Sequence, residues 1–285
     1  MALDEVKLSL ANKFTGGVKG NRVVRSTTAN SGAAWEIQPS IVVSPTGADD
    51  TANIMDAITG LGSSGGSVEF TPGNYQHTGL VISGRSDIAL FCRARPGARG
   101  AASFFCTNPA MDCLKIRNGS RILISGLWLG HSLRSDAGKS AIRAQSLQQL
   151  TMEDISTWTT VGAGSTNGCI LESIDAEHYI THFNRCFFVN HEENGFVANG
   201  SAPNRRVLET TFTDCFISGN TLSALKLIDY VHGFYLNTGV NMSGNGTGLA
   251  IIPTVNDGRT RDIECWGTIF DNGIVQQVFS QNTSG

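Results

Sequence analysis

Gly168-Cys169-Ile170-Leu171 is one copy of a short pattern, a small residue followed by an apolar run, that recurs along most of this chain. Counted at the first apolar residue, successive copies are separated by 25 to 28 residues. A nearly constant period of this length indicates a repeat architecture, in which each unit packs against the next. The first apolar residues of the copies are Leu114, Ala141, Cys169, Phe196, Ala224, Leu249 and Ile274.

A second landmark recurs about half a period later, where an apolar strand bends and resumes, in segments 152–155, 183–187, 212–216 and 236–240. Each unit therefore holds short runs rich in β-branched or aromatic residues, separated by Gly, Asn, Ser and Asp. These features predict an all-β fold, a right-handed parallel β-helix of about eight rungs whose early strands include 80–82. Each strand would pair with its counterpart one coil away, at about 4.8 Å.

The composition excludes several other classes of protein. The chain has 285 residues, a net charge of −3, 40% hydrophobic residues and 16% charged residues, so it is too apolar for a disordered polyanion. Its basic residues are scattered, so nucleic acid is not an expected partner, and the longest apolar runs are too short to predict a membrane span. The seven cysteines lack metal-binding spacing, which predicts buried thiols, no bound metal and no cofactor.

The open strand edges at the start of a solenoid need a cap, and residues 51–61 supply a candidate. The acidic residues before Thr51 favour a helix start. Ile54, Ile58 and Leu61 recur at helical spacing. We therefore expect one N-terminal helix that lies across the first rung and buries its apolar stripe in the core.

The segment that contains this helix also carries a family likeness. It begins Pro45-Thr46-Gly47-Ala48-Asp49-Asp50-Thr51 and continues, after the helix, as Gly65-Gly66-Ser67-Val68-Glu69-Phe70-Thr71-Pro72-Gly73-Asn74-Tyr75. The Asp-Asp-Thr helix start and the Gly-Gly-x-Val-x-Phe-x-Pro-Gly-x-Tyr strand resemble the opening of pectate-lyase-like β-helix domains, which bacteriophage tailspikes and tail fibres commonly contain. The likeness is specific for the fold and weak for the reaction, because the same opening precedes hydrolases, lyases, epimerases and binding rods.

The resemblance implies a phage tailspike-like or tail-fibre-like receptor-binding protein that binds a bacterial surface polysaccharide, capsule or lipopolysaccharide. If it is also an enzyme, it would be a polysaccharide depolymerase, either a glycoside hydrolase or a polysaccharide lyase. The resemblance further implies a homotrimer in the virion, assembled in the host cytoplasm. Cytoplasmic folding fits the charged residues at 4–7, where a secretion signal needs an apolar run. A non-catalytic structural virion or adaptor protein, with the β-helix as a rigid rod, is the alternative.

Two parts of the chain differ in pattern. Residues 45–285 form the predicted β-helix domain, whereas residues 1–44 do not follow the period and are rich in Gly, Ser, Thr, Asn and basic residues. On the family likeness, residues 1–44 would be an arm that attaches the protein to other virion tail proteins. An ordinary mobile terminus is the other interpretation.

Glycoside cleavage requires two carboxyl groups about 5 to 9.5 Å apart, and a regular repeat allows such spacings to be counted. Aligning the bends places Glu153, Arg185 and Asp214 in one column on successive rungs. Glu153 and Asp214 would then be a catalytic pair two rungs apart, about 9.6 Å, with Arg185 between them as a substrate-binding residue. The competing interpretation is a surface ladder of alternating charge that performs no chemistry.

A second group of acidic residues and histidines is expected on one or two rungs. Its catalytic candidates are Glu172, Asp175, His191 and Glu192. A histidine beside carboxylates can act as a general base, and Arg143 is the candidate to bind and neutralise a uronate. His191 and Glu192 fall in a loop after a rung, where function concentrates on such rods. Solvated loop charge is the alternative.

Carbohydrate binding favours flat aromatic faces with polar neighbours. Trp158, in the predicted loop 157–167, and Tyr230, after a rung strand, are therefore candidate substrate-binding residues. The other aromatic residues that fall inside rung strands are predicted to be part of the core. They are Trp128, Trp266, Phe183, Phe187, Phe212 and Phe216.

Overall fold

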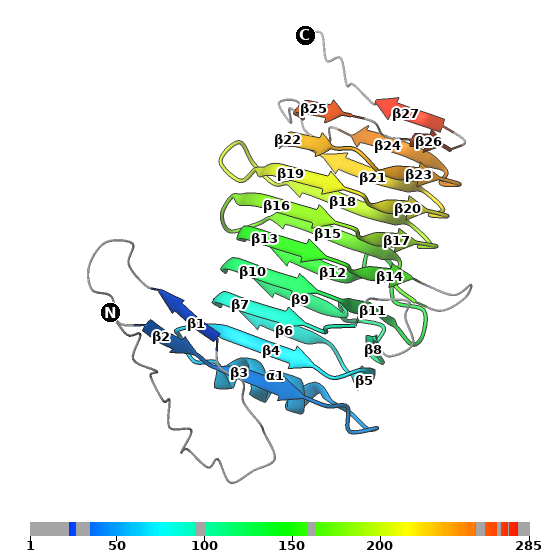
Figure 1. Ribbon diagram of the computed structural model, residues 1–285. Coiled ribbons are helices and arrows are strands. Elements are labelled where there is room, and N and C mark those ends of the chain that lie inside the picture. Colours follow the sequence, from blue (N-terminus) through cyan, green and yellow to red (C-terminus); the bar gives the residue numbers. More distant parts are fainter. Residues whose placement is uncertain are drawn as a thin grey trace, which may run out of the picture.

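The computed structural model describes residues 23–26, 35–94, 101–158, 164–252, 254, 260–266, 269–272 and 274–278. Within them the chain winds into a solenoid of three parallel sheets, which confirms the predicted parallel β-helix (Figure 1). Each complete turn contributes one strand to each sheet, and two of the three sheets contain eight strands each. No helix in this part of the chain is long and apolar enough to span a membrane.

After the first two strands of sheet 1, which are consecutive strands of the chain, the strands of the three sheets follow one another in strict rotation. Sheet 1 contains β3 (Ser40–Val43), β4 (Gly66–Phe70), β7 (Ser86–Phe91), β10 (Ser120–Ser125), β13 (Gln148–Glu153), β16 (His178–Asn184), β19 (Val207–Thr213), β22 (Val231–Leu236) and β25 (Arg261–Cys265). Sheet 2 contains β5 (Gly73–His77), β8 (Ala102–Cys106), β11 (Leu127–His131), β14 (Ser156–Trp158), β17 (Phe187–Val189), β20 (Phe216–Ser218), β23 (Asn241–Ser243) and β26 (Ile269–Asp271). Sheet 3 contains β6 (Leu80–Ser83), β9 (Leu114–Arg117), β12 (Ser140–Gln145), β15 (Asn167–Ser173), β18 (Asn194–Gly200), β21 (Ser223–Ile228), β24 (Thr247–Ile252) and β27 (Ile274–Val278).

The register of sheet 3 confirms that residues about one period apart are neighbours. Cys169 pairs with Phe196 as expected, but the partner of Leu114 and Cys169 on the intervening strand is Ile142, not Ala141. Both Ala141 and Ile142 are fully buried, because the small residue at the start of the strand also faces the interior at the corner. The apolar pattern alone therefore could not fix the register to the residue.

The predicted bends between sheets 1 and 2 are made by residues with a left-handed backbone. Asp154, Arg185 and Asp214 have φ angles of 52°, 51° and 51°. Sheet 1 has a further column of left-handed residues within its strands, one in each strand from β7 to β25. The ladder pairing skips these residues but keeps the same offset on both sides of them. That column is Asp87, Arg121, Gln149, Ile180, Glu209, Gly233 and Asp262.

The N-terminal end of the stack is capped as predicted. Helix α1 (Thr51–Gly60) lies at this end beside β3 and buries Ile54 and Ile58 (Figure 1). β3 pairs in parallel with β4 and belongs to the stack, although it lies within the segment 1–44 that we assigned to the arm. Most of that segment lies outside the described residues, apart from the antiparallel pair β1 (Val23–Ser26) and β2 (Trp35–Gln38).

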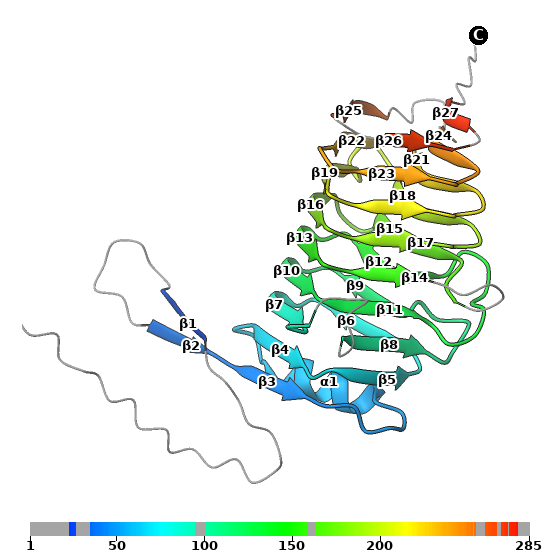
Figure 2. The same cartoon turned by 45° about the vertical axis from the view of Figure 1, so that its right-hand side comes forward.

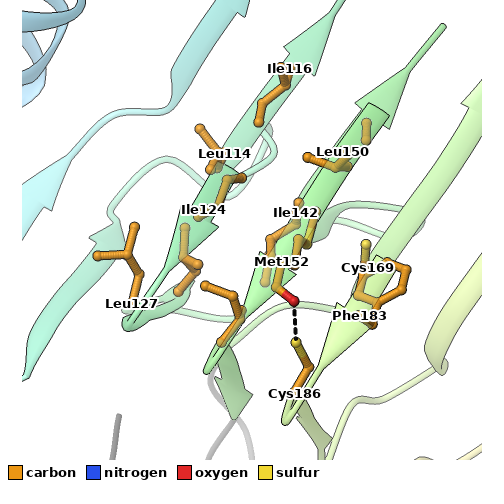
Figure 3. Packing of buried hydrophobic residues seen from close by; sticks show 14 of the residues in the cluster. Leu114, Ile116, Ile124, Leu127, Ile142, Leu150, Met152, Cys169, Phe183 and Cys186 are labelled. Carbon is orange, nitrogen blue, oxygen red and sulfur yellow. Dashed lines mark hydrogen bonds between the residues drawn. The ribbon is translucent and has the colours of Figure 1, made fainter. Parts of the chain in front are cut away.

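The interior is a continuous apolar column, part of which Figure 3 shows around Leu114, Ile142 and Phe183. Six of the seven cysteines are buried there as free thiols, which confirms their prediction, whereas Cys265 is exposed. In the same figure the thiol of Cys186 donates to the carbonyl of Met152.

Only half of the predicted phenylalanine columns lie inside. Phe183 stacks on Phe212 with ring centroids 4.5 Å apart, and both are buried. Phe187, predicted to be core, is 45% exposed, and Phe216 beside it is half-buried. The reason is that Phe188 occupies the inward position of the three-residue strand β17, so alternation turns Phe187 outward.

Candidate functional site

The first predicted catalytic group does not form one column. Glu153 is opposite Asn184, and Arg185 and Asp214 belong instead to the neighbouring bend column that contains Asp154. The prediction was wrong by one residue because it aligned Ile155 with the outward residue after the bend. The buried equivalents of Ile155 are thiol side chains, Cys186 on the next rung and Cys215 on the one after.

Arg185 is engaged with the rung that precedes it. Its guanidinium donates to Glu153 Oε1 at 2.5 Å and to Asp154 Oδ1 at 2.8 Å. These hydrogen bonds, the one with Asp154 first, raise the pKa of Arg185. Glu153 is therefore held in a partly exposed ion pair, the arrangement expected of the alternative charge ladder.

The second predicted group does not form one cluster of free catalytic groups, because its members are engaged in different contacts. Arg143 lies on β12 under the loop 132–139, where it donates to Asp112 Oδ2 at 2.8 Å and to Glu172 Oε1 at 2.7 Å. A third bond goes to the carbonyl of Gly138. Burial alone would lower the pKa of Arg143, but the hydrogen bonds and charges of its two carboxylate partners outweigh that effect and raise it. Arg143 and Glu172 thus form a mostly buried ion-pair network.

His191 is buried, although the sequence suggested an exposed loop. Nε2 lies 3.0 Å from Thr157 Oγ1, and Nδ1 lies 3.0 Å from the carbonyl oxygen of Ser165. Burial lowers the pKa of His191 to about 4, so the ring is neutral at pH 7.

Two further candidates lie apart from His191. Asp175 is exposed in the loop after β15, and Tyr230 is only 9% exposed.

A pocket of about 390 Å³ opens between three loops that connect sheet 2 to sheet 3. Glu192, one of the predicted residues, lines it and accepts a hydrogen bond from Arg134 Nε at 2.7 Å. Glu193 is fixed by Asn167 Nδ2, which donates to it at 2.8 Å. The full lining is Arg134, Ser135, Asp136, Ala137, Thr166, Glu192 and Glu193. Within the described part of the chain, no group of three or more His, Cys, Asp or Glu residues is suited to a metal ion.

An aromatic pair lies on the outer side of sheet 2, whose strands Figure 2 shows one above another. Trp158 is 44% exposed and stacks on Trp128, with ring centroids 5.9 Å apart and planes inclined by 22°. Phe105 contacts the Trp128 ring edge-on at 5.3 Å. Trp128 was predicted to be core, but it points outward because its neighbours Leu127 and Leu129 take the inward positions of β11.

The outward residues of sheet 2 from β8 to β23 form what we call the aromatic face. Trp266, also predicted to be core, does not belong to it and is 63% exposed near the C-terminal end of the stack. The residues of the aromatic face are Ser103, Phe105, Trp128, Gly130, Ser156, Trp158, Phe187, Val189, Phe216, Ser218, Asn241 and Ser243.

The aromatic pair lies on the two strands, β11 and β14, that lead into two of the pocket loops. Trp158 ends β14, and the chain next returns to the described residues at Gly164, which forms a parallel bridge with Arg134 of the pocket. Thr166, two residues later, lines that pocket. Flat aromatic rings beside a polar concavity are the arrangement that suits a sugar, because pyranose rings stack on aromatic faces while their hydroxyls need hydrogen-bond partners. The sequence had identified Trp158 and Glu192, but not the other components.

No protein-family model matches this sequence, and no curated protein matches it. The solved structures that resemble it include the A-module of the mannuronan C-5 epimerase AlgE6 of Azotobacter vinelandii, at 13% identity and a TM-score of 0.35, covering 81% of this chain and 94% of that one. ORF18 of Geobacillus virus E2 has 11% identity and a TM-score of 0.31, with coverage of 92% and 69%. PfbA, a surface adhesin of Streptococcus pneumoniae, has 10% identity and a TM-score of 0.28, with coverage of 80% and 93%.

Proposed function

We propose that this protein is a polysaccharide-binding β-solenoid of the phage tailspike or tail-fibre type, which recognises a bacterial surface glycan on its aromatic face. The observation that carries the proposal is the exposed Trp158 stacked on Trp128 beside the pocket of Arg134 and Glu192. Soluble monomers rarely expose large aromatic rings together unless the surface binds something. The tailspike assignment is supported by the opening segment 45–75.

Binding is tested by titrating capsule and lipopolysaccharide preparations into the full chain. Trp158→Ala should weaken binding at least about tenfold, since one well-placed aromatic contact contributes more than about 1.4 kcal/mol. Trp266→Ala is the matched control, because Trp266 is also exposed but lies off the aromatic face, and it should leave the affinity unchanged. If no glycan binds, the result favours the alternative function, a structural virion or adaptor protein that uses the β-helix as a rigid rod.

Depolymerase activity is a separate question within this proposal. Release of reducing ends would indicate a hydrolase, and new double-bond absorbance a lyase. Glu192→Gln is the first variant to test for loss of either signal, because Glu192 lines the pocket. Glu153→Gln should not abolish activity, since the carboxylate of Glu153 is held by Arg185.

Two further parts of the proposal have their own tests. Light scattering measures whether the protein is a homotrimer. A pull-down with virion tail proteins tests whether residues 1–44 attach the protein to them.

A further inference from the structure

The aromatic face differs from the outer sides of the other two sheets in its charge. None of its residues from Ser103 to Ser243 is charged. By contrast, the outer side of sheet 1 carries the ion pair Arg121–Asp87, and that of sheet 3 carries lysines such as Lys226. The absence of charge is therefore a property of this face rather than of the whole chain.

Among the residues that the structure describes, both edges of the aromatic face carry more negative than positive charge. The described bends on one side hold Glu153, Asp154 and Asp214 with two cations, Arg185 and Arg93, and Arg93 is paired with Glu69. On the other side, the pocket is lined by three carboxylates, of Asp136, Glu192 and Glu193, and by the one guanidinium of Arg134. Segment 95–100, which carries Arg95 and Arg99, lies outside the described residues and precedes β8, two rungs before Trp158.

We infer that the polysaccharide bound along the aromatic face is uncharged, built from neutral sugars rather than from uronic acids, sialic acids or phosphorylated units. This inference rests on the proposed function and names its ligand class. A carboxylate or phosphate laid against the aromatic rings would lose water without gaining a cationic partner. It would also be repelled by the excess of carboxylates at the described edges of the face.

The polar residues of the face fit the same ligand class. Ser156 lies beside Trp158 on β14, and Ser218 and Ser243 follow on later rungs, with Ser243 Oγ 3.4 Å from Ser218 Oγ. Serine hydroxyls both donate and accept hydrogen bonds, as sugar hydroxyls do. They can therefore pair with a neutral sugar without the charge compensation that an acidic polymer requires.

The test compares each acidic polymer with its own neutral derivative. A panel of neutral and acidic bacterial surface polysaccharides is titrated into the full chain, and each uronate-containing polymer is also presented after its carboxylates have been reduced to primary alcohols. Neutral polymers should bind with a Kd that changes less than about twofold between about 50 and 500 mM NaCl, because no counterions are released. Carboxyl reduction should strengthen binding of an acidic polymer about tenfold or more.

A charge placed on the face provides a second, opposite test. Ser218→Lys should create binding of the unreduced acidic polymers, whereas Ser218→Gln, which adds length without charge, should not. Sedimentation measures the oligomeric state of the unchanged protein and of Phe187→Ser. If no second copy covers the aromatic face, the substitution should leave that state unchanged.

The possible results separate the inference from the proposed function. Trp158-dependent binding that is equal or tighter for an unreduced acidic polymer would overturn the inference while leaving glycan binding in place. Failure of every polymer, native or reduced, to bind in a Trp158-dependent way would reject the proposed function and the inference together. An oligomer that Phe187→Ser dissociates would show that a second copy covers the face, and would also overturn the inference.

Discussion

The side-chain amide of Asn220 donates at 2.7 Å to Oδ1 of Asn245, which lies 25 residues later and one rung above. The side-chain amide of Asn245 donates in the same way to Oδ1 of Asn272, at 2.7 Å. The backbone N–H of Asn220 also donates to Oδ1 of Asn245. Asn220 and Asn245 are both buried. This ladder ties successive loops together and satisfies backbone groups that the strands leave unpaired.

Asn245→Ala should therefore destabilise the protein by about 3 kcal/mol, because it leaves the backbone N–H and one side-chain N–H of Asn220 buried without partners. The measurement is the urea midpoint of unfolding. Asn237→Ala is the control, since Asn237 is half-buried and makes one long side-chain bond of 3.4 Å, and its effect should stay within about 0.5 kcal/mol. Equal losses for the two variants would contradict a special role of the ladder.

Phe183→Ala should cost about 3 to 5 kcal/mol, because it opens a cavity beside Phe212 in the core. Phe187→Ala should cost much less, since that side chain is 45% exposed. Thermal and urea unfolding of the two variants measure the difference. If Phe187→Ala were the more damaging substitution, the assignment of inward and outward positions on β17 would be wrong.

Ile180 is a β-branched residue with a φ of 48°, a conformation that such residues rarely adopt. Ile180→Asn should raise the melting temperature, by an amount that corresponds to about 1 kcal/mol, because Asn tolerates the left-handed region. Gly233 occupies the equivalent position of β22, with a φ of 69°. Gly233→Ile should lower the melting temperature, because it introduces a β-branched residue into that conformation. A loss of stability in Ile180→Asn would mean that the apolar contacts of Ile180 outweigh the strain.

Stability should fall as the pH falls below about 6.5, because three histidines are buried in the neutral form. Burial lowers the pKa of His178 from 6.5 to about 3, and those of His77 and His191 to about 4. Between about pH 4 and 6.5 the unfolded chain thus binds more protons than the folded one. Each histidine contributes a slope of up to about 1.4 kcal/mol per pH unit, favouring the folded state at higher pH.

Urea midpoints at pH 7, 6 and 5 measure this dependence. The control is His182→Gln, because His182 is exposed on the outer side of β16, and it should leave the slope unchanged. A urea midpoint that stays constant from pH 7 to 5 would rule out neutral burial of these rings.

Arg143→Met should destabilise the protein by about 3 to 5 kcal/mol, because it leaves the buried carboxylate of Asp112 and the mostly buried carboxylate of Glu172 without a cation. Arg134→Met removes an exposed ion pair with Glu192 and should cost less than about 1 kcal/mol. Urea unfolding compares them. If Arg143→Met is as stable as the unchanged protein but no longer binds glycan, the result would support the substrate-binding role that the sequence predicts for Arg143.

The sequence alone determined the architecture. Its period of 25 to 28 residues requires successive coils to stack, because an isolated coil cannot bury its apolar side chains, and the spacing of Ile54 and Ile58 sufficed to place the capping helix. Residue types and their places in the repeat also identified Trp158 and Glu192 as candidates, because a tryptophan suits sugar stacking and a carboxylate in a loop after a rung suits a binding or catalytic site.

Only the tertiary structure decided which side chains face outward and which loops meet. Inward and outward positions alternate along a strand, but each left-handed bend, such as those at Asp154 and Arg185, resets that alternation. A one-residue error at a bend therefore led to the wrong prediction that Phe187 is core, where the structure buries Phe188. The same error placed Glu153 in the wrong column. The pocket joins Arg134 to Glu192, which lie 58 residues and two rungs apart. The period brings their loops near each other, but the folding of those loops decides that the two side chains pair.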